Sequence, residues 1–269
     1  MKNELAALLT LIITLPGLQG QTQNMKSINN QNTNKMKAKS VLIIVTSTSE
    51  IEQTGKKTGL WIEELASPYY LFTDQGFAVT IASPKGGKGP IDPKSTQPDF
   101  STATVKRFFS DPAAQHLLDH TIKLSDINPD DYDAVYYPGG TGPVWDLPQN
   151  AFSIHIIESF YQAGKTTALV CHAPAALKQV RDSTGELLIK GKKIAGYSNS
   201  EEAAGASKDM VPFSLEDMIK AEGGIYVKGE DWHSFVVSEG NLITGQNPGS
   251  SAAVAQTVIE ALKSGQPLH

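Results

Sequence analysis

Short apolar runs that alternate with helical stretches constrain the fold of this chain more than any other sequence feature. Four runs lack the polar alternation of a half-exposed strand and predict strands buried on both faces; they are residues 40–47 (SVLIIVTS), 77–84 (FAVTIASP), 133–140 (DAVYYPGG) and 166–172 (TTALVCH). Shorter runs predict later strands at residues 192–198, 224–229, 234–240 and 241–245. Helices are predicted between the strands, at residues 61–75, 112–119, 148–163, 173–181, 211–221 and 250–263. This order predicts an α/β fold, a flavodoxin-like three-layer sandwich with helices on both faces of a largely parallel central sheet.

The composition argues against a nucleic-acid-binding protein. The chain has 269 residues, a net charge of −5 and a pI of about 5.7. It therefore lacks the basic excess with which proteins bind the phosphates of a nucleic acid. Cys171 is the single cysteine, so no internal disulfide can form and the fold must depend on packing.

The first 38 residues differ from the rest of the chain. Residues 1–20 combine Lys2, an apolar stretch and small residues after it, which predicts a signal peptide; the alternative is a loosely packed N-terminal helix. Residues 21–38 are polar and predict a disordered linker before one domain at residues 39–269. The apolar stretch is too short for a permanent anchor. We expect an exported protein, periplasmic or secreted, with no membrane span in the mature chain; without a signal peptide it would be cytoplasmic.

Cys171 lies at the end of the fourth predicted strand, directly before a predicted helix. Such a strand-to-helix turn holds a nucleophile above the edge of a sheet. The positive end of the helix dipole is expected to favour the thiolate and to lower the thiol pKa. The alternative is a structural role, because free cysteine is often a buried apolar residue. The position at the turn favours the nucleophile.

Two other strand ends carry groups that suit a nucleophile. The third strand leads into the glycines of residues 139–142, whose backbone N–H groups can face a developing oxyanion. Beyond the first strand, Glu63 and Glu64 lie among apolar residues. A carboxyl buried beside Cys171 would have a raised pKa and could move protons, whereas an exposed helical glutamate would do neither. The residues alone do not distinguish Glu63 from Glu64.

Six segments between residues 41 and 262 resemble the DJ/PfpI superfamily, which has the class I glutamine amidotransferase-like fold. They follow the family order: TGLWIEELASPYYLF, FAVTIASPKGGKGPIDPKS, DYDAVYYPGGTGPVWDL, ALVCHAPAAL, GYSNSEE and NLITGQNPGSSAAV. The likeness is greatest to the heat-shock-protein-31-type branch, which includes glutathione-independent glyoxalases and holding chaperones. The resemblance implies a nucleophile-elbow cysteine within the predicted sandwich.

The resemblance implies four catalytic residues and two residues of an oxyanion-binding loop. The catalytic residues are the nucleophile Cys171, its neighbour His172, the general acid or base Glu64 and the triad acid Glu202. The oxyanion-binding residues are Gly140 and Thr141. Glu64 matches because it precedes Pro68 by four residues, and spacing favours Glu202 over Glu201 within SNSEEAAG.

Two positions depart from the family pattern. Ala173 follows the Cys-His pair where many relatives have glycine, which adds one methyl group. The loop after the third strand reads Gly-Gly-Thr-Gly where many relatives have a histidine, which puts in doubt any mechanism that needs an imidazole there.

The expected function is that of a glyoxalase of type III, a lyase or hydratase. Such an enzyme converts methylglyoxal or a related 2-oxoaldehyde to a 2-hydroxy acid through a cysteine hemithioacetal. The partner is a small-molecule carbonyl substrate, and neither a cofactor nor a metal is predicted, because no phosphate-binding loop or zinc motif occurs. The alternatives are a stress-related holding chaperone or protein deglycase, and a cysteine peptidase or amidase. A homodimer is expected.

Overall fold

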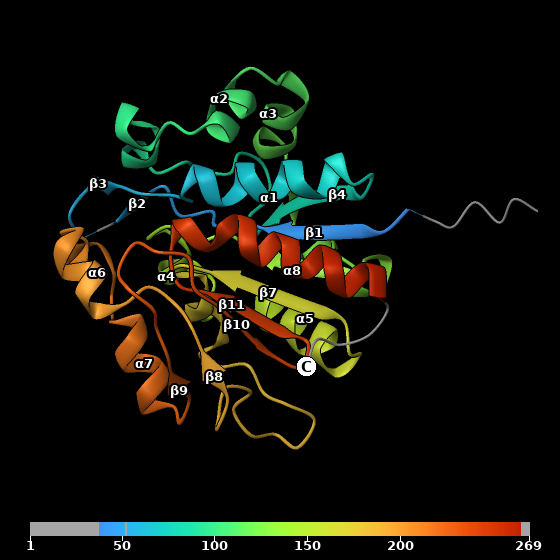
Figure 1. Cartoon of the computed structure of the whole chain (residues 1–269), viewed down its shortest axis with the longest axis vertical. Helices are drawn as coiled ribbons and strands as arrows, with labels where there is room; N and C mark the ends of the chain where they lie inside the picture. Colours follow the sequence, from blue (N-terminus) through green and yellow to red (C-terminus); the bar gives the residue numbers. More distant parts are fainter. Residues whose placement is uncertain (1–37, 52, 265–269) are drawn as a thin grey trace, which may run out of the picture. The chain divides into compact units, whose positions relative to one another are not determined.

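A central sheet of seven strands runs through the described part of the chain in the order β10-β11-β7-β6-β1-β4-β5 (Figure 1). The computed structural model describes residues 38–51 and 53–264. The predicted signal peptide (1–20) and residues 21–37 of the predicted linker lie outside the described residues. The sheet consists of β1 (Ser40–Ile44), β4 (Ala78–Ser83), β5 (Ile122–Lys123), β6 (Ala134–Tyr137), β7 (Thr166–Val170), β10 (Val236–Glu239) and β11 (Leu242–Gly245).

The four longest predicted apolar runs supply β1, β4, β6 and β7. Each of these strands pairs in parallel with its neighbours, and within the seven-stranded sheet only β10 and β11 pair antiparallel. Every residue of β6 and β7 is buried, which explains why their sequences are apolar without alternation. The predicted, largely parallel α/β sandwich is confirmed.

Helices cover both faces of the sheet (Figure 1). On one face α1 (Ile62–Asp74) packs against α8 (Ser251–Ser264), and on the other α5 (Ala151–Gln162) packs against β6 and β7. The remaining α-helices are α2 (Ala103–Phe109), α3 (Pro112–Asp119), α4 (Pro143–Asp146), α6 (Asn199–Ala204) and α7 (Leu215–Ala221). Within the residues that the structure describes, no helix has both the length and the apolar character needed to cross a membrane.

Some predicted elements were wrong in type or extent. The helix predicted at residues 173–181 is the shorter 3₁₀ helix η5 (Ala173–Leu177), all five residues of which are buried. The runs at 192–198 and 224–229 form a separate pair of strands, β8 (Lys193–Ile194) and β9 (Ile225–Tyr226). Several elements were not predicted, namely α2, α4, α6, β5 and the small sheet of β2 (Glu50–Ile51) and β3 (Lys56–Lys57).

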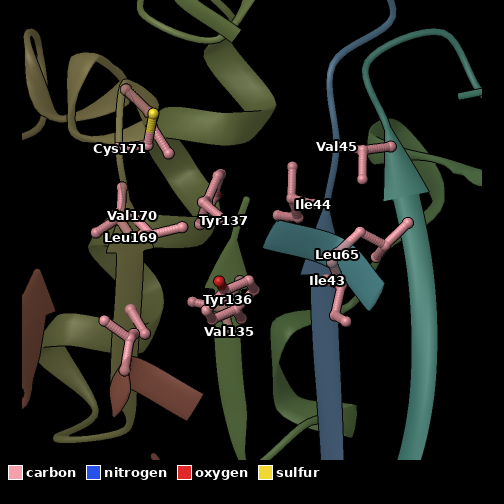
Figure 2. Close-up of a cluster of buried hydrophobic side chains, with 14 of the residues drawn as sticks. Ile43, Ile44, Val45, Leu65, Val135, Tyr136, Tyr137, Leu169, Val170 and Cys171 are labelled. Carbon is pink, nitrogen blue, oxygen red and sulfur yellow. The ribbon is translucent and has the colours of Figure 1, made fainter. Parts of the chain in front are cut away.

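The core continues to the carboxyl edge of the sheet, where the site lies. Figure 2 shows buried side chains of adjacent strands, with Cys171 at the end of β7 beyond Leu169 and Val170. Burial of large apolar side chains, each contributing about 1.5–3 kcal/mol, holds these strand ends in place. The position of Cys171 is therefore fixed by the core rather than by a mobile loop.

Candidate active site

Cys171 stands on a strained turn between β7 and η5. Its φ of 60° lies in the left-handed region, which a non-glycine residue adopts only when its surroundings enforce it. Two backbone hydrogen bonds do so: the Cys171 N–H donates to Gly245 O (2.9 Å), and Cys171 O accepts from Tyr197 N–H (2.8 Å). The residue is 3% exposed. The strand-to-helix turn that the sequence predicted is thus present, although the helix is of 3₁₀ type.

His172 connects the thiol to Glu202. Its Nδ1 lies 3.4 Å from Cys171 Sγ, and its Nε2 lies 2.6 Å from Glu202 Oε1. The Ser207 hydroxyl donates to the other Glu202 oxygen. Burial raises the pKa of Glu202, but the hydrogen bond and charge of His172, with the Ser207 hydroxyl, outweigh this and leave that pKa below its ordinary value. The structure therefore brings Cys171, His172 and Glu202 together.

Glu201, the alternative to Glu202, points away from His172. Its Oε1 accepts three hydrogen bonds, from the Trp232 N–H (2.9 Å) and from the side-chain amides of Gln246 (3.1 Å) and Asn247 (2.7 Å). Its Oε2 completes the capping box of α6 with Ser198. Glu201 is fully buried and ties two loops, the one at Trp232 and the one at Gln246 and Asn247, to the start of α6.

Glu64, near the start of α1, lies beside the thiol. It is completely buried, and its Oε2 accepts the Gly139 N–H at 2.6 Å. Burial raises its pKa from 4.5 to about 8, although the nearby Cys171 thiol and the Gly139 N–H partly offset this. A Cβ on Gly139 would lie 2.8 Å from both Cys171 Cβ and Glu64 Oε2, so only glycine fits between these two side chains.

Glu63, the other glutamate of this pair, lies outside the site. Its carboxylate accepts hydrogen bonds from the hydroxyls of Thr102 and Thr104, and it is only half-buried. The helix turns these adjacent side chains to different surroundings, so Glu64, which the resemblance indicated, is the glutamate beside the thiol and Glu63 is not.

The prediction that the Cys171 pKa is lowered was wrong. Burial raises this pKa well above its ordinary value, and the nearby Glu64 carboxyl raises it further. The N–H groups of Gly140 and His172 act in the opposite direction but do not compensate. A five-residue 3₁₀ helix has too small a dipole to overcome the loss of solvent. The thiol is therefore neutral in the absence of substrate.

Gly140 and Thr141 lie where three backbone segments run side by side. Residues 59–61 form the middle segment: Trp61 N–H donates to Gly139 O (3.0 Å) on one side, and Leu60 N–H donates to Pro90 O (2.9 Å) on the other. Gly140 has a φ of 100°, and a Cβ there would lie 2.5 Å from Gly59 O, so this position requires glycine. The Thr141 hydroxyl hydrogen-bonds with that of Thr58 at 2.6 Å.

A cavity of about 830 Å³ opens above the thiol. Three non-glycine residues have positive φ in the described chain, and all three line this cavity; they are Cys171 (60°), Ala206 (52°) and Trp232 (67°). Backbone strain concentrated at one cavity is typical of a functional site. Across residues 38–51 and 53–264, no group of three or more His, Cys, Asp or Glu side chains is placed to hold a metal ion.

Sequence reasoning missed several residues of the cavity wall, notably Asp92, Tyr197 and Ser207. The Tyr197 ring lies 4.3 Å from that of His172, between ring centroids. Asp92 had a signal in the sequence, because an aspartate before a proline is typical of a helix N-cap. That signal predicts a turn but not that the turn faces a cavity.

The fold and this site define an α/β sandwich protein with a buried cysteine–histidine–glutamate cluster at the carboxyl edge of its sheet. The model of the DJ-1/PfpI family matches residues 59–261, so the chain belongs to the DJ-1/PfpI family. This confirms the resemblance seen in the sequence.

Two relatives match over nearly their whole length. Glyoxalase 3 of Candida albicans is 33% identical over 232 residues, which cover 83% of this chain and 98% of the relative. The glutathione-independent glyoxalase HSP31 of Saccharomyces cerevisiae is 31% identical, with 85% and 100% covered.

Solved structures give the same result. The Rapid Encystment Protein 24 KDa of Francisella tularensis has a TM-score of 0.79 at 35% identity, covering 83% of this chain and 99% of that chain. The glyoxalase III structure from Candida albicans has a TM-score of 0.76 at 32% identity, covering 83% and 97%.

Proposed function

We propose that this chain is a glutathione-independent glyoxalase that converts methylglyoxal, or a related 2-oxoaldehyde, to the 2-hydroxy acid. The observation that carries the proposal is the contact of the buried Cys171 thiol with the His172–Glu202 pair at the wall of a cavity. The names of the relatives from Candida albicans and Saccharomyces cerevisiae support an enzyme of this kind.

Cys171 is the nucleophile in this scheme, and His172 handles its proton. Because the thiol is neutral before substrate binds, it must lose its proton as it attacks. His172 Nδ1 accepts this proton, and the Glu202 carboxylate stabilises the imidazolium through Nε2. The sulfur adds to the aldehyde carbon C1, and the proton passes from His172 to the aldehyde oxygen. The product of this step is a neutral hemithioacetal.

Glu64 then moves a proton between the two carbonyl carbons. As a carboxylate it takes the proton from C1, which gives an enediolate, and it returns the proton to C2. The hydroxyl proton on the C1 oxygen passes to the C2 oxygen in the same rearrangement, which leaves a thioester of the 2-hydroxy acid. A carboxyl with a pKa of about 8 suits this role, since its pKa lies near physiological pH. The N–H groups of Gly140 and Thr141 stabilise the enediolate oxygen.

Water completes the reaction by cleaving the thioester. His172 takes a proton from water as the oxygen adds to the thioester carbonyl, and it returns the proton to the departing sulfur of Cys171. The sum is one water molecule added to one 2-oxoaldehyde, so carbon C1 is oxidised and C2 is reduced within the same molecule. The scheme requires no external electron acceptor.

The test is lactate formation from methylglyoxal by the purified chain, without glutathione or any other thiol. We expect turnover by the unchanged protein and a loss of about 1000-fold or more in Cys171→Ala, because the covalent step is removed. The Glu63→Gln variant is the control, since Glu63 lies outside the site. Equal turnover by Cys171→Ala and the unchanged protein would refute the scheme.

The other expectations from the sequence remain proposals. They are the holding-chaperone, deglycase and peptidase activities, the homodimer, and export through a signal peptide to the periplasm or the outside. Suppression of protein aggregation by Cys171→Ala distinguishes the chaperone from the enzyme, because a chaperone surface does not need the thiol.

A further inference from the structure

Asp92 offers the cavity a carboxylate oxygen that the proposed reaction does not use. Asp92 is 8% exposed, lines the cavity and caps the 3₁₀ helix η1 (Pro93–Thr96). Its Oδ1 accepts the Lys94 N–H at 2.9 Å, and this is the one hydrogen bond to the carboxylate in the described chain. Burial raises the pKa of Asp92, while Lys94 and the charge of His172 act in the opposite direction. Oδ2 therefore remains available to a donor inside the cavity.

The backbone fixes the separation between Asp92 and the reacting centre. The segment 59–61 lies between residues 90–92 and the loop that contains Gly140, with backbone hydrogen bonds on both sides. Adjacent strands lie about 4.8 Å apart, so the backbones of Asp92 and Gly140 lie about 10 Å apart. A three-carbon 2-oxoaldehyde spans roughly 3 Å between its end carbons, and a six-carbon chain spans roughly 6 Å. Either chain can span this gap with an aspartate side chain and one hydrogen bond, but only a hydroxylated chain carries an O–H group that can donate to Asp92.

The walls of the cavity also suit a carbon chain that carries hydroxyl groups. Two aromatic pairs line it, Trp61 with Phe100 (ring centroids 4.9 Å apart) and Tyr197 with Trp232 (5.8 Å apart). Aromatic faces accept the C–H surface of a carbon chain, and a buried carboxylate accepts its hydroxyl hydrogens. A volume of about 830 Å³ is far larger than a three-carbon substrate needs.

We infer that the cavity takes 2-oxoaldehydes with a hydroxylated chain of about six carbons, as sugars yield on dehydration, and that Asp92 accepts a hydroxyl hydrogen of that chain. This inference rests on the proposed function, because it places the aldehyde carbon at Cys171. It goes further by assigning the substrate class and a residue that selects it.

The experiment measures binding to Cys171→Ala by calorimetry, so that it does not depend on turnover. The three probes are 3-deoxyglucosone, which is long and hydroxylated, methylglyoxal, which is short, and phenylglyoxal, which is bulky without hydroxyls. We expect 3-deoxyglucosone to bind at least about tenfold more tightly than either of the others, because it alone reaches Asp92 with a donor. Equal or tighter binding of methylglyoxal or phenylglyoxal would overturn the inference.

A matched pair of variants in the Cys171→Ala background tests Asp92 itself. In Asp92→Asn the amide oxygen keeps the cap to Lys94, so an NH₂ group replaces the free oxygen, and affinity for 3-deoxyglucosone should fall about tenfold. Asp111→Asn is the control, because Asp111 also caps a helix through Oδ1 and lies outside the cavity, while its Oδ2 accepts the Tyr70 hydroxyl. Equal affinity in the Asp92 variant and the control would also overturn the inference. Absence of methylglyoxal turnover by the unchanged protein would instead refute the proposed function, while the binding comparison still decides the substrate class.

Discussion

At the scale of single residues, the buried carboxyl of Glu64 leads to a prediction about pH. Its pKa is raised from 4.5 to about 8 by burial, so the carboxylate that the mechanism needs is a minor form at neutral pH. We expect kcat/KM for methylglyoxal to rise about tenfold per pH unit below pH 8 and to level off above it. The measurement is the rate with methylglyoxal from about pH 6 to about pH 9, within which the carboxyl titrates.

Glu64→Gln cannot ionise, so it should lose this pH dependence together with about 100-fold or more in kcat/KM. Glu63→Gln should keep the profile of the unchanged protein, because Glu63 bonds to threonine hydroxyls away from the thiol. A flat profile for the unchanged protein would remove Glu64 from the role of base.

The same residues show where sequence reasoning reaches its limit. Because the carboxyl ends of parallel strands meet at one edge of a sheet, the residues allowed a carboxyl beside the thiol, with an exposed helical glutamate as the alternative. The residues alone could not choose Glu64 over Glu63, since the choice depends on how helix α1 is rotated against the core; only the family resemblance indicated Glu64. The thiol pKa was predicted in the wrong direction because burial outweighs the short η5 helix, and burial is a property of the whole fold.

At the scale of elements, α6 places two adjacent glutamates in different roles. Glu201 holds three loop donors and the cap of the helix, whereas Glu202 holds His172. We expect Glu201→Gln to lower the free energy of unfolding by about 2 kcal/mol, because charge-assisted hydrogen bonds to a buried group are lost.

We expect Glu202→Gln to lower kcat/KM by about tenfold or more, because an amide cannot stabilise the imidazolium. Denaturant unfolding and methylglyoxal kinetics on both variants measure these effects.

The two variants control for each other. If Glu201→Gln lost activity without a loss of stability, the assignment of Glu202 as the partner of His172 in the reaction would be wrong.

Prediction of elements succeeded where burial is uniform along the chain. The strands β1, β6 and β7 are buried along nearly their whole length, and β4 is buried over its second half, so their apolar runs identify them. The short elements α6 and β5 were not predicted, because few of their residues are buried: two of the six in α6 and neither of the two in β5. Their sequences carry capping or edge-strand signals rather than apolar periodicity. No apolar pattern in the sequence therefore indicates the part of the cavity wall that α6 forms.

At the scale of the whole molecule, the buried acids link the stability of the fold to pH. Burial raises the pKa of Glu64 from 4.5 to about 8 and that of Asp146 from 3.8 to about 6. For an acid with a raised pKa, the folded state keeps a proton that the unfolded chain releases. Its contribution to stability is therefore fully present below the unfolded pKa and is lost as pH rises through the folded pKa. We expect the unchanged protein to lose stability between about pH 4 and pH 8, in two overlapping steps that reflect these two groups.

Glu64→Gln isolates the upper step of this loss. The amide stays neutral at every pH, so the variant should not pay the cost of ionising a carboxyl in the core. One pKa unit corresponds to about 1.4 kcal/mol, so above pH 8 the variant should gain on the unchanged protein by roughly 5 kcal/mol relative to their difference near pH 4. Denaturant unfolding from about pH 4 to about pH 9 measures this, with Glu63→Gln as the control that should follow the unchanged protein. Parallel stability curves for Glu64→Gln and the unchanged protein would mean that Glu64 does not titrate in the folded state, and the same result would leave the proposed reaction without its base.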